Sequence, residues 1–148
     1  MNENEIIERE QKAQELYRSG FNCCQAVFCA CADIYNIDND LALRISAAFG
    51  GGVGQMRMLC GAANGMFLLA GLEKGNTLPN HPELKKPTYQ LVQQLAAKYK
   101  DEYGSLICSE LLGLTPTSQC VRKEPCIKMI AKAVRIACEN IDTLINKQ

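Results

Sequence analysis

Hydrophobic residues recur along this chain mostly at intervals of three and four positions, the spacing that places them on one face of an α-helix. No convincing run alternates between apolar and polar residues as a half-buried β-strand does. The pattern therefore predicts an all-α fold, a single compact domain of about six or seven helices that spans residues 1–148. The expected helices cover residues 3–19, 22–35, 40–48, 60–72, 88–103, 105–112 and 125–145.

Residues with special backbone preferences mark the ends of these helices. Gly20 and Gly104 are expected just beyond helix C-termini, where a left-handed conformation is common. Asn22 is a suitable N-cap for the second helix, and Pro125 is a suitable first residue for the last one. Glycines and prolines also predict a loop over residues 73–87.

The hydrophobic faces indicate how two of the helices lie. The first helix has a thin apolar stripe among many charged residues, so we expect it at the periphery of the fold. The third helix is expected to carry Leu41, Ile45 and Ala48 on one face.

Composition excludes several classes of protein. Sixteen basic residues balance sixteen acidic ones, so the chain has no electrostatic footprint for nucleic acid. No stretch is apolar enough to span a membrane, and the charged first residues do not form a signal peptide. Nine cysteines is an odd number, which rules out complete intramolecular pairing. We therefore expect a cytoplasmic protein with reduced or metal-bound thiols.

Four of the nine cysteines lie at or near the start of an expected helix. Unpaired backbone N–H groups and the positive end of the helix dipole stabilise a thiolate at that position. The thiolate is the form of cysteine that attacks electrophiles and binds metals. A small apolar residue near a helix end would explain any one of them, but four together indicate a shared thiol or metal site. The four are Cys23, Cys60, Cys108 and Cys126.

The remaining cysteines are assigned differently. Cys24, Cys29, Cys31 and Cys138 lie within expected helices among apolar residues, where cysteine behaves as a small hydrophobic residue. Cys120 lies in the expected loop 114–124 and is either a spare redox partner or an exposed bystander. No Cys-x-x-Cys spacing is present, so any shared site has to be assembled by the fold.

Glycines near Cys60 form the second candidate feature. The run at residues 50–52 is followed by neither a Gly-Lys-Ser/Thr motif nor a strand pattern, which argues against a phosphate-binding loop. Bare backbone permits close approach of another helix or of a bound cluster. Arg57 could stabilise a nearby thiolate, although we take it as a solvated side chain. The candidate cofactor-binding glycines are Gly50, Gly51, Gly52, Gly61 and Gly65.

The segments around these cysteines and glycines resemble those of the C_GCAxxG_C_C family of redox-active proteins. The resemblance runs from about residue 17 to residue 137, in the same order. It implies a small protein with four signature cysteines, the same four that begin helices, and leaves open which of Cys23 and Cys24 points inward. The matching segments are Gly20-Phe21-Asn22-Cys23-Cys24-Gln25-Ala26-Val27, Phe49-Gly50-Gly51-Gly52-Val53-Gly54, Cys60-Gly61-Ala62-Ala63-Asn64-Gly65, Tyr103-Gly104-Ser105-Leu106-Ile107-Cys108, Leu111-Leu112-Gly113 and Cys126.

Three functions are consistent with this set of residues. The first is electron transfer by an iron–sulfur cluster or another soft metal, because a cation neutralises converging thiolates. The second is thiol–disulfide redox chemistry. The third is a non-catalytic module that holds structural zinc or a small molecule. The expected partners are an electron or thiol partner protein and a second copy of the chain in a homodimer; the sequence assigns no catalysed reaction.

Overall fold

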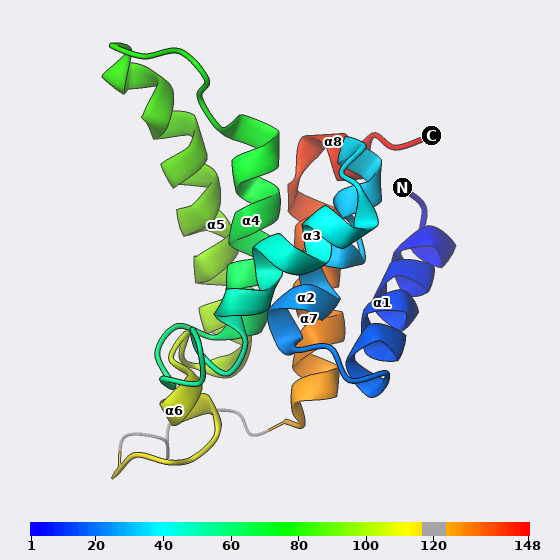
Figure 1. The fold of residues 1–148 in the computed structure, drawn as a ribbon, viewed down its shortest axis with the longest axis vertical. Helices are drawn as coiled ribbons and strands as arrows, with labels where there is room; N and C mark the ends of the chain where they lie inside the picture. The colour runs from blue at the N-terminus through cyan, green and yellow to red at the C-terminus, as the bar shows by residue number, and fades with distance from the viewer. Residues whose placement is uncertain (117–123) are drawn as a thin grey trace.

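The computed structural model describes residues 1–116 and 124–148, and these residues fold into helices with no β-strand among them (Figure 1). The only β-type pairing in this part of the chain is an isolated antiparallel bridge between Leu59 and Ile107. The predicted all-α fold is therefore confirmed. The α-helices are α1 (Glu3–Arg18), α2 (Cys23–Cys29), α3 (Asn39–Ser46), α4 (Gly61–Lys74), α5 (Lys85–Tyr103), α6 (Cys108–Leu111), α7 (Cys126–Asn140) and α8 (Asp142–Ile145).

The helix ends follow the local signals in the sequence. Asn22 caps α2, accepting a hydrogen bond from the Gln25 N–H at 2.9 Å while the Gln25 side chain accepts one from the Asn22 N–H. Gly104 follows α5 with φ +84°, the left-handed conformation that glycine adopts without a steric penalty. Pro125 immediately precedes α7.

Several predicted boundaries are wrong. The second helix does not continue to Tyr35, because the Cys31 N–H bonds to the Phe28 carbonyl, three residues back, and a 3₁₀-helix over Ala32–Tyr35 follows. The last helix stops at Asn140 and a short α8 follows it. α5 begins at Lys85, inside the predicted loop. Pro87 lies in its first turn, where a backbone N–H has no partner within the helix, so the missing N–H of proline costs nothing there.

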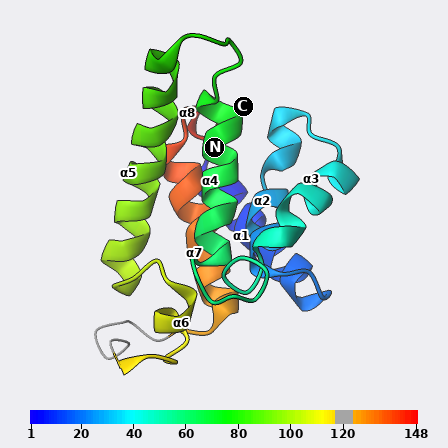
Figure 2. The ribbon, with the colours of Figure 1, turned by 60° about the vertical axis from the view of Figure 1, so that its left-hand side comes forward.

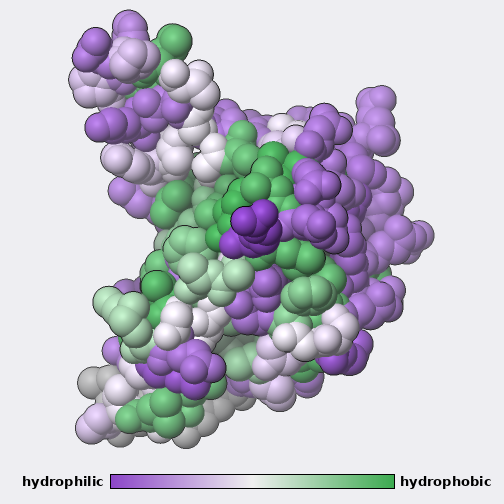
Figure 3. All heavy atoms as spheres, viewed as in Figure 1, coloured by the Kyte–Doolittle hydropathy of each residue, from purple (hydrophilic) through white to green (hydrophobic). Residues whose placement is uncertain are grey.

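The apolar face predicted for α3 lies toward solvent. Leu41 and Ile45 are 48% and 41% exposed, and Ala48, beyond the helix, is exposed as well. The buried residues of α3 are Ala42 and Ser46, whose hydroxyl donates to the Ala42 carbonyl at 2.7 Å. α3 packs against α2 with its small buried residues. Figure 3 shows hydrophobic residues gathered on the outer surface in the middle of the view.

The core lies where α2, α4 and α7 contact one another. α5 packs along α4 on one side and α1 packs along α7 on another (Figure 2). α1 lies at the periphery, as the sequence predicts, and Arg135 of α7 forms ion pairs with Glu10 and Glu3 of α1 at 2.7 and 2.8 Å. The largest fully buried side chains include Phe28, Met66, Leu69, Leu95, Tyr99, Tyr103 and Ile130. None of the described helices combines the length and hydrophobicity that crossing a membrane requires.

Candidate functional site

A pocket of about 190 Å³ lies where α2, α4, α6 and α7 begin. Each of these four helices contributes to its wall a cysteine from its first residue or its N-cap. The rest of the wall is mostly apolar. The lining residues are Tyr17, Asn22, Cys23, Gly51, Arg57, Cys60, Gly61, Ala62, Cys108, Leu111, Leu112, Cys126, Met129 and Ile130. The structure thus brings together Cys23, Cys60, Cys108 and Cys126, which we call the pocket cysteines.

Cys23 reaches the pocket because α2 and α4 approach closely. A Cβ atom placed on Gly61 would lie 2.2 Å from the Cys23 sulfur and 2.9 Å from the Phe49 carbonyl oxygen. Only glycine at this position lets the sulfur lie against the first turn of α4. Cys24, the next residue, is fully buried and absent from the pocket wall. Of these two neighbours, Cys23 is therefore the one that faces the pocket.

The backbone pairing between Leu59 and Ile107 aligns two more cysteines. The Cys60 N–H donates to the Leu106 carbonyl at 2.7 Å, and the Cys108 N–H donates to the Met58 carbonyl at 2.6 Å. Because side chains alternate between faces in an extended pair, Cys60 and Cys108 lie on the same face as diagonal neighbours. This extended segment also explains why α6 begins at Cys108 rather than at the predicted Ser105.

Cys60 is buried in a site that keeps its thiol protonated. Burial raises its pKa to about 11, although a hydrogen bond with Tyr99 and the amides of Ala63 and Ala62 oppose this shift. The Cys60 sulfur lies 3.3 Å from the Tyr99 hydroxyl. Burial and the neighbouring Cys60 raise the pKa of Tyr99, so its O–H keeps its proton and can donate to the sulfur. The Tyr99 ring packs against Tyr103, with 4.9 Å between the ring centroids.

Arg57 provides a cation beside Cys108 in the pocket wall. Its guanidinium Nη1 lies 3.8 Å from the Cys108 sulfur. Arg57 has φ +60°, and its N–H donates to the Gly51 carbonyl, so the glycine loop folds back and holds the residue in this conformation. A Cβ atom on Gly52 would lie 2.6 Å from the Cys108 Cβ. Only glycine at position 52 therefore lets this loop lie against Cys108. Arg57 is exposed, as expected of a solvated side chain, and its guanidinium also contacts the Cys108 sulfur.

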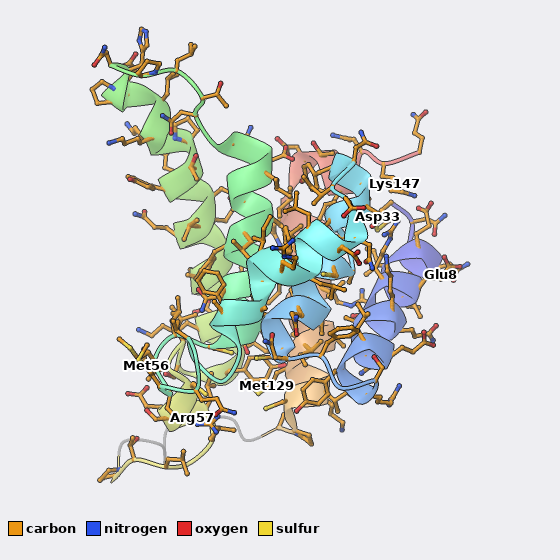
Figure 4. The ribbon with its side chains drawn as sticks, in the orientation of Figure 1. Glu8, Asp33, Met56, Arg57, Met129 and Lys147 are labelled. Carbon is orange, nitrogen blue, oxygen red and sulfur yellow. The ribbon has the colours of Figure 1, made fainter. Side chains whose placement is uncertain are left out.

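Cys126 completes the pocket from the first turn of α7. Burial and then the charges of Cys23 and Cys108 raise its pKa, which Arg57 opposes. These interactions indicate that the thiols influence one another electrostatically. Figure 4 shows Arg57 and Met129 at the end of the molecule where α7 begins.

The predicted glycines take different positions. Gly51 and Gly61 line the pocket, and Gly52 lies behind Cys108. Gly50 packs against the Asn22 side chain. Gly65 lies one turn further along α4, where a Cβ would meet Val27 at 2.7 Å, and it supports the contact between α2 and α4 rather than the pocket.

The cysteines expected in the core are buried, but three of them are not isolated among aliphatic side chains. The sulfur of Cys31 lies 4.0 Å from that of Cys138. The Cys29 sulfur lies 4.0 Å from the Ser46 hydroxyl. Cys120 falls outside the described residues. Periodicity identifies the buried positions but cannot identify partners that belong to different helices.

Four sulfur donors are the ligands that iron–sulfur clusters and zinc prefer. Within residues 1–116 and 124–148, however, no three side chains of His, Cys, Asp or Glu stand close enough together to hold one metal ion. As the side chains lie, the pocket cysteines do not fit a single bound ion.

Two residues of the site were not recognised from the sequence. Tyr99 lies within the predicted helix 88–103, and nothing in its neighbourhood along the chain marks it as a partner of Cys60. Tyr17 also lines the pocket, and burial together with the charges of Cys126 and Cys23 raises its pKa.

Comparison with protein-family models matches residues 21–140 to C_GCAxxG_C_C, which is described as "Putative redox-active protein". This match covers most of the chain and includes every pocket cysteine. No curated protein and no solved structure matches the chain.

Proposed function

We propose that the pocket is the redox site of this protein and that its four cysteines transfer electrons there. The proposal follows from the family to which the chain belongs, the C_GCAxxG_C_C redox-active proteins. The observation that carries the proposal is that four thiols from distant parts of the sequence line one small, mostly apolar pocket. An engineered cavity of about 150 Å³ admits a molecule of the size of benzene. The pocket therefore has room for a small reacting group.

The charges in the pocket suggest distinct roles for two of the thiols. Cys60 is buried, hydrogen-bonded to Tyr99 and protonated at neutral pH. Cys108 lies beside the Arg57 guanidinium, which stabilises an anionic sulfur. Environments that differ in this way assign the roles of proton holder and nucleophile to neighbouring groups. We therefore assign the attacking thiolate to Cys108.

The reaction that these residues support is exchange with a disulfide of a partner protein. The Cys108 thiolate attacks one sulfur of that disulfide, forms a mixed disulfide and releases the other sulfur as a thiolate. A second pocket cysteine then attacks the Cys108 sulfur and releases the partner. The pocket thiols lose two electrons and two protons in total, and the partner's disulfide gains both as two thiols.

Binding of an iron–sulfur cluster or zinc is the alternative. The four sulfur donors favour it, whereas the spacing of the described side chains does not. A non-catalytic module that holds zinc or a small molecule is the third candidate. We also propose a cytoplasmic location, where thiols stay reduced, and a homodimer.

Protein purified without oxygen distinguishes these functions. We expect no visible absorption band, no stoichiometric metal, and loss of thiols in pairs when the protein is treated with a small disulfide under native conditions. Cys108→Ser should abolish formation of the mixed disulfide, whereas Cys29→Ser, which changes a buried cysteine outside the pocket, should leave it intact. A broad visible absorption with bound iron would replace thiol exchange with the cluster, and stoichiometric zinc without redox cycling would contradict both.

A further inference from the structure

A second pair of cysteines lies away from the pocket. The sulfurs of Cys31 and Cys138 are 4.0 Å apart, and the two residues are 0% and 1% exposed. Cys31 follows α2 directly before the 3₁₀-helix Ala32–Tyr35, and Cys138 lies in the last turns of α7. Neither residue lines the pocket.

The pair and the pocket lie at opposite ends of the same two elements. α2 and α7 both begin at the pocket, with Cys23 and Cys126, and both run toward the contact between Cys31 and Cys138. Cys138 is 12 residues after Cys126 (138 − 126), a rise of about 18 Å at 1.5 Å per residue. The two sites are therefore separated by more than the reach of a side chain.

We infer that Cys31 and Cys138 form a second redox site, a buried dithiol that a small peroxide oxidises to a disulfide between α7 and the segment after α2. A sulfur–sulfur bond of about 2.05 Å requires the two sulfurs to approach by about 2 Å. Rotation of the two side chains in their present positions can supply part of this approach. The inference goes beyond the function proposed for the pocket and does not depend on it.

The surroundings of the pair favour one thiolate. A hydrogen bond with Cys31 and the charge of Arg9 lower the pKa of Cys138, whereas burial opposes the shift. The same hydrogen bond, together with burial, raises the pKa of Cys31. Arg9 is held beside the pair, since its Nη1 donates to the Ala30 carbonyl at 2.9 Å and pairs with Asp33. Cys138 is therefore the nucleophile and Cys31 the thiol that follows.

The step balances with hydrogen peroxide as oxidant. The Cys138 thiolate attacks one peroxide oxygen, the O–O bond breaks, and Cys138 becomes a sulfenic acid while hydroxide leaves. The Cys31 sulfur then displaces the hydroxyl group from Cys138 to form the disulfide. In sum, two thiols and one peroxide yield one disulfide and two waters. The burial of both sulfurs favours an oxidant of this size over a protein or a bulky disulfide.

The disulfide would join positions 107 residues apart (138 − 31). A cross-link over so long a stretch removes many conformations from the unfolded chain, so the oxidised protein should unfold at a higher temperature. The effect on Tm separates a disulfide in the native geometry from incidental oxidation at the surface.

The test treats the full, reduced chain, under native conditions, with enough hydrogen peroxide to oxidise both the pocket thiols and this pair. Remaining thiols are then blocked with N-ethylmaleimide, and the peptides are mapped by mass spectrometry without reduction. We expect a peptide that links Cys31 to Cys138, and a rise in Tm that dithiothreitol reverses. Cys31→Ala and Cys138→Ala should each remove that rise, whereas Cys29→Ala should keep it, since Cys29 is equally buried but faces Ser46.

Several results would overturn the inference. The first is that the pocket cysteines become oxidised while Cys31 and Cys138 are both recovered as maleimide adducts or as separate sulfinic acids. The second is a linked peptide whose formation does not change Tm. Peptide mapping of the unsubstituted chain decides the question even if an alanine variant fails to fold. Failure at this pair with normal oxidation at the pocket would leave the proposed function standing.

Discussion

The close contact of α4 with α2 can be tested by adding one methyl group at a time along α4. Gly65 and Gly71 are both interior residues of this helix, but their surroundings differ. A Cβ on Gly65 would lie 2.7 Å from the Val27 Cβ and 3.2 Å from the Cys24 carbonyl oxygen, whereas a Cβ on Gly71 would meet no atom within 4 Å. Gly71→Ala is therefore a matched control for Gly65→Ala.

The expected magnitudes follow from two opposing contributions. Replacing glycine with alanine in a helix interior stabilises a protein by about 0.5–1 kcal/mol, because alanine loses less backbone entropy on folding. Both variants gain this contribution. Gly65→Ala must also shift Val27 by several tenths of an ångström, since ordinary contact begins near 3.4 Å, and overpacking of this kind costs about 1–3 kcal/mol. The two variants should thus differ by about 1–3 kcal/mol in unfolding free energy.

Urea unfolding followed by circular dichroism measures this difference. We expect a higher midpoint than wild type for Gly71→Ala and a midpoint for Gly65→Ala that lies below that of Gly71→Ala, with similar m-values. Gly61→Ala, which would place a methyl group 2.2 Å from the Cys23 sulfur, should additionally change the alkylation rate of Cys23. Equal stabilisation by Gly65→Ala and Gly71→Ala would refute the packing of α4 on α2 that brings Cys23 to the pocket.

Three further predictions concern the pocket and the core. Tyr99→Phe removes the hydroxyl 3.3 Å from the Cys60 sulfur. This hydrogen bond lowers the pKa of Cys60 and contributes about 0.5–1.5 kcal/mol, so its loss reduces the fraction of thiolate. The alkylation rate of Cys60 at pH 8 should therefore fall by about two- to tenfold in peptide-resolved mass spectrometry. An unchanged rate would contradict the contact. The unfolding free energy of the wild type should decrease from about pH 9 to about pH 11. The pKa of Cys60 is about 11 in the folded state, so the thiol of the unfolded chain loses its proton at lower pH. A urea midpoint that stays constant over this range would count against a buried, protonated Cys60. Leu95→Ala should cost about 2–5 kcal/mol in chemical denaturation because Leu95 is fully buried, whereas Leu41→Ala should change stability by about 0.5 kcal/mol or less. Similar losses would contradict the exposed position of Leu41.

The features that the sequence predicted well are those set by neighbouring residues. Asn22, Gly104 and Pro125 mark helix ends through their own side chains and backbone preferences, and all three lie at the expected ends. The order of helices, and the cysteine at each of four helix starts, follow from the same local signals together with the family resemblance.

The features that the sequence missed depend on the arrangement of the helices. Leu41 and Ile45 have the spacing of a core face, but α3 packs through alanine and serine, and periodicity cannot tell which face meets a neighbour. The contact between Cys31 and Cys138 joins positions that are close only after α2 and α7 run side by side. The position of Arg57 follows from its left-handed backbone conformation, which no glycine or asparagine at that residue signals.

The placement of the pocket cysteines at four helix starts has a consequence for how the protein folds. Cys23 and Cys126 are separated by 103 positions (126 − 23), so the pocket closes through contacts of long sequence range. Closing a chain over such a distance costs conformational entropy before any contact compensates for it. During synthesis, the segments that carry Cys23, Cys60 and Cys108 emerge before α7 exists. We therefore expect the four thiols to remain apart on the nascent chain and to acquire their shared chemistry only when α7 docks, which makes thiol reactivity a marker of completed folding.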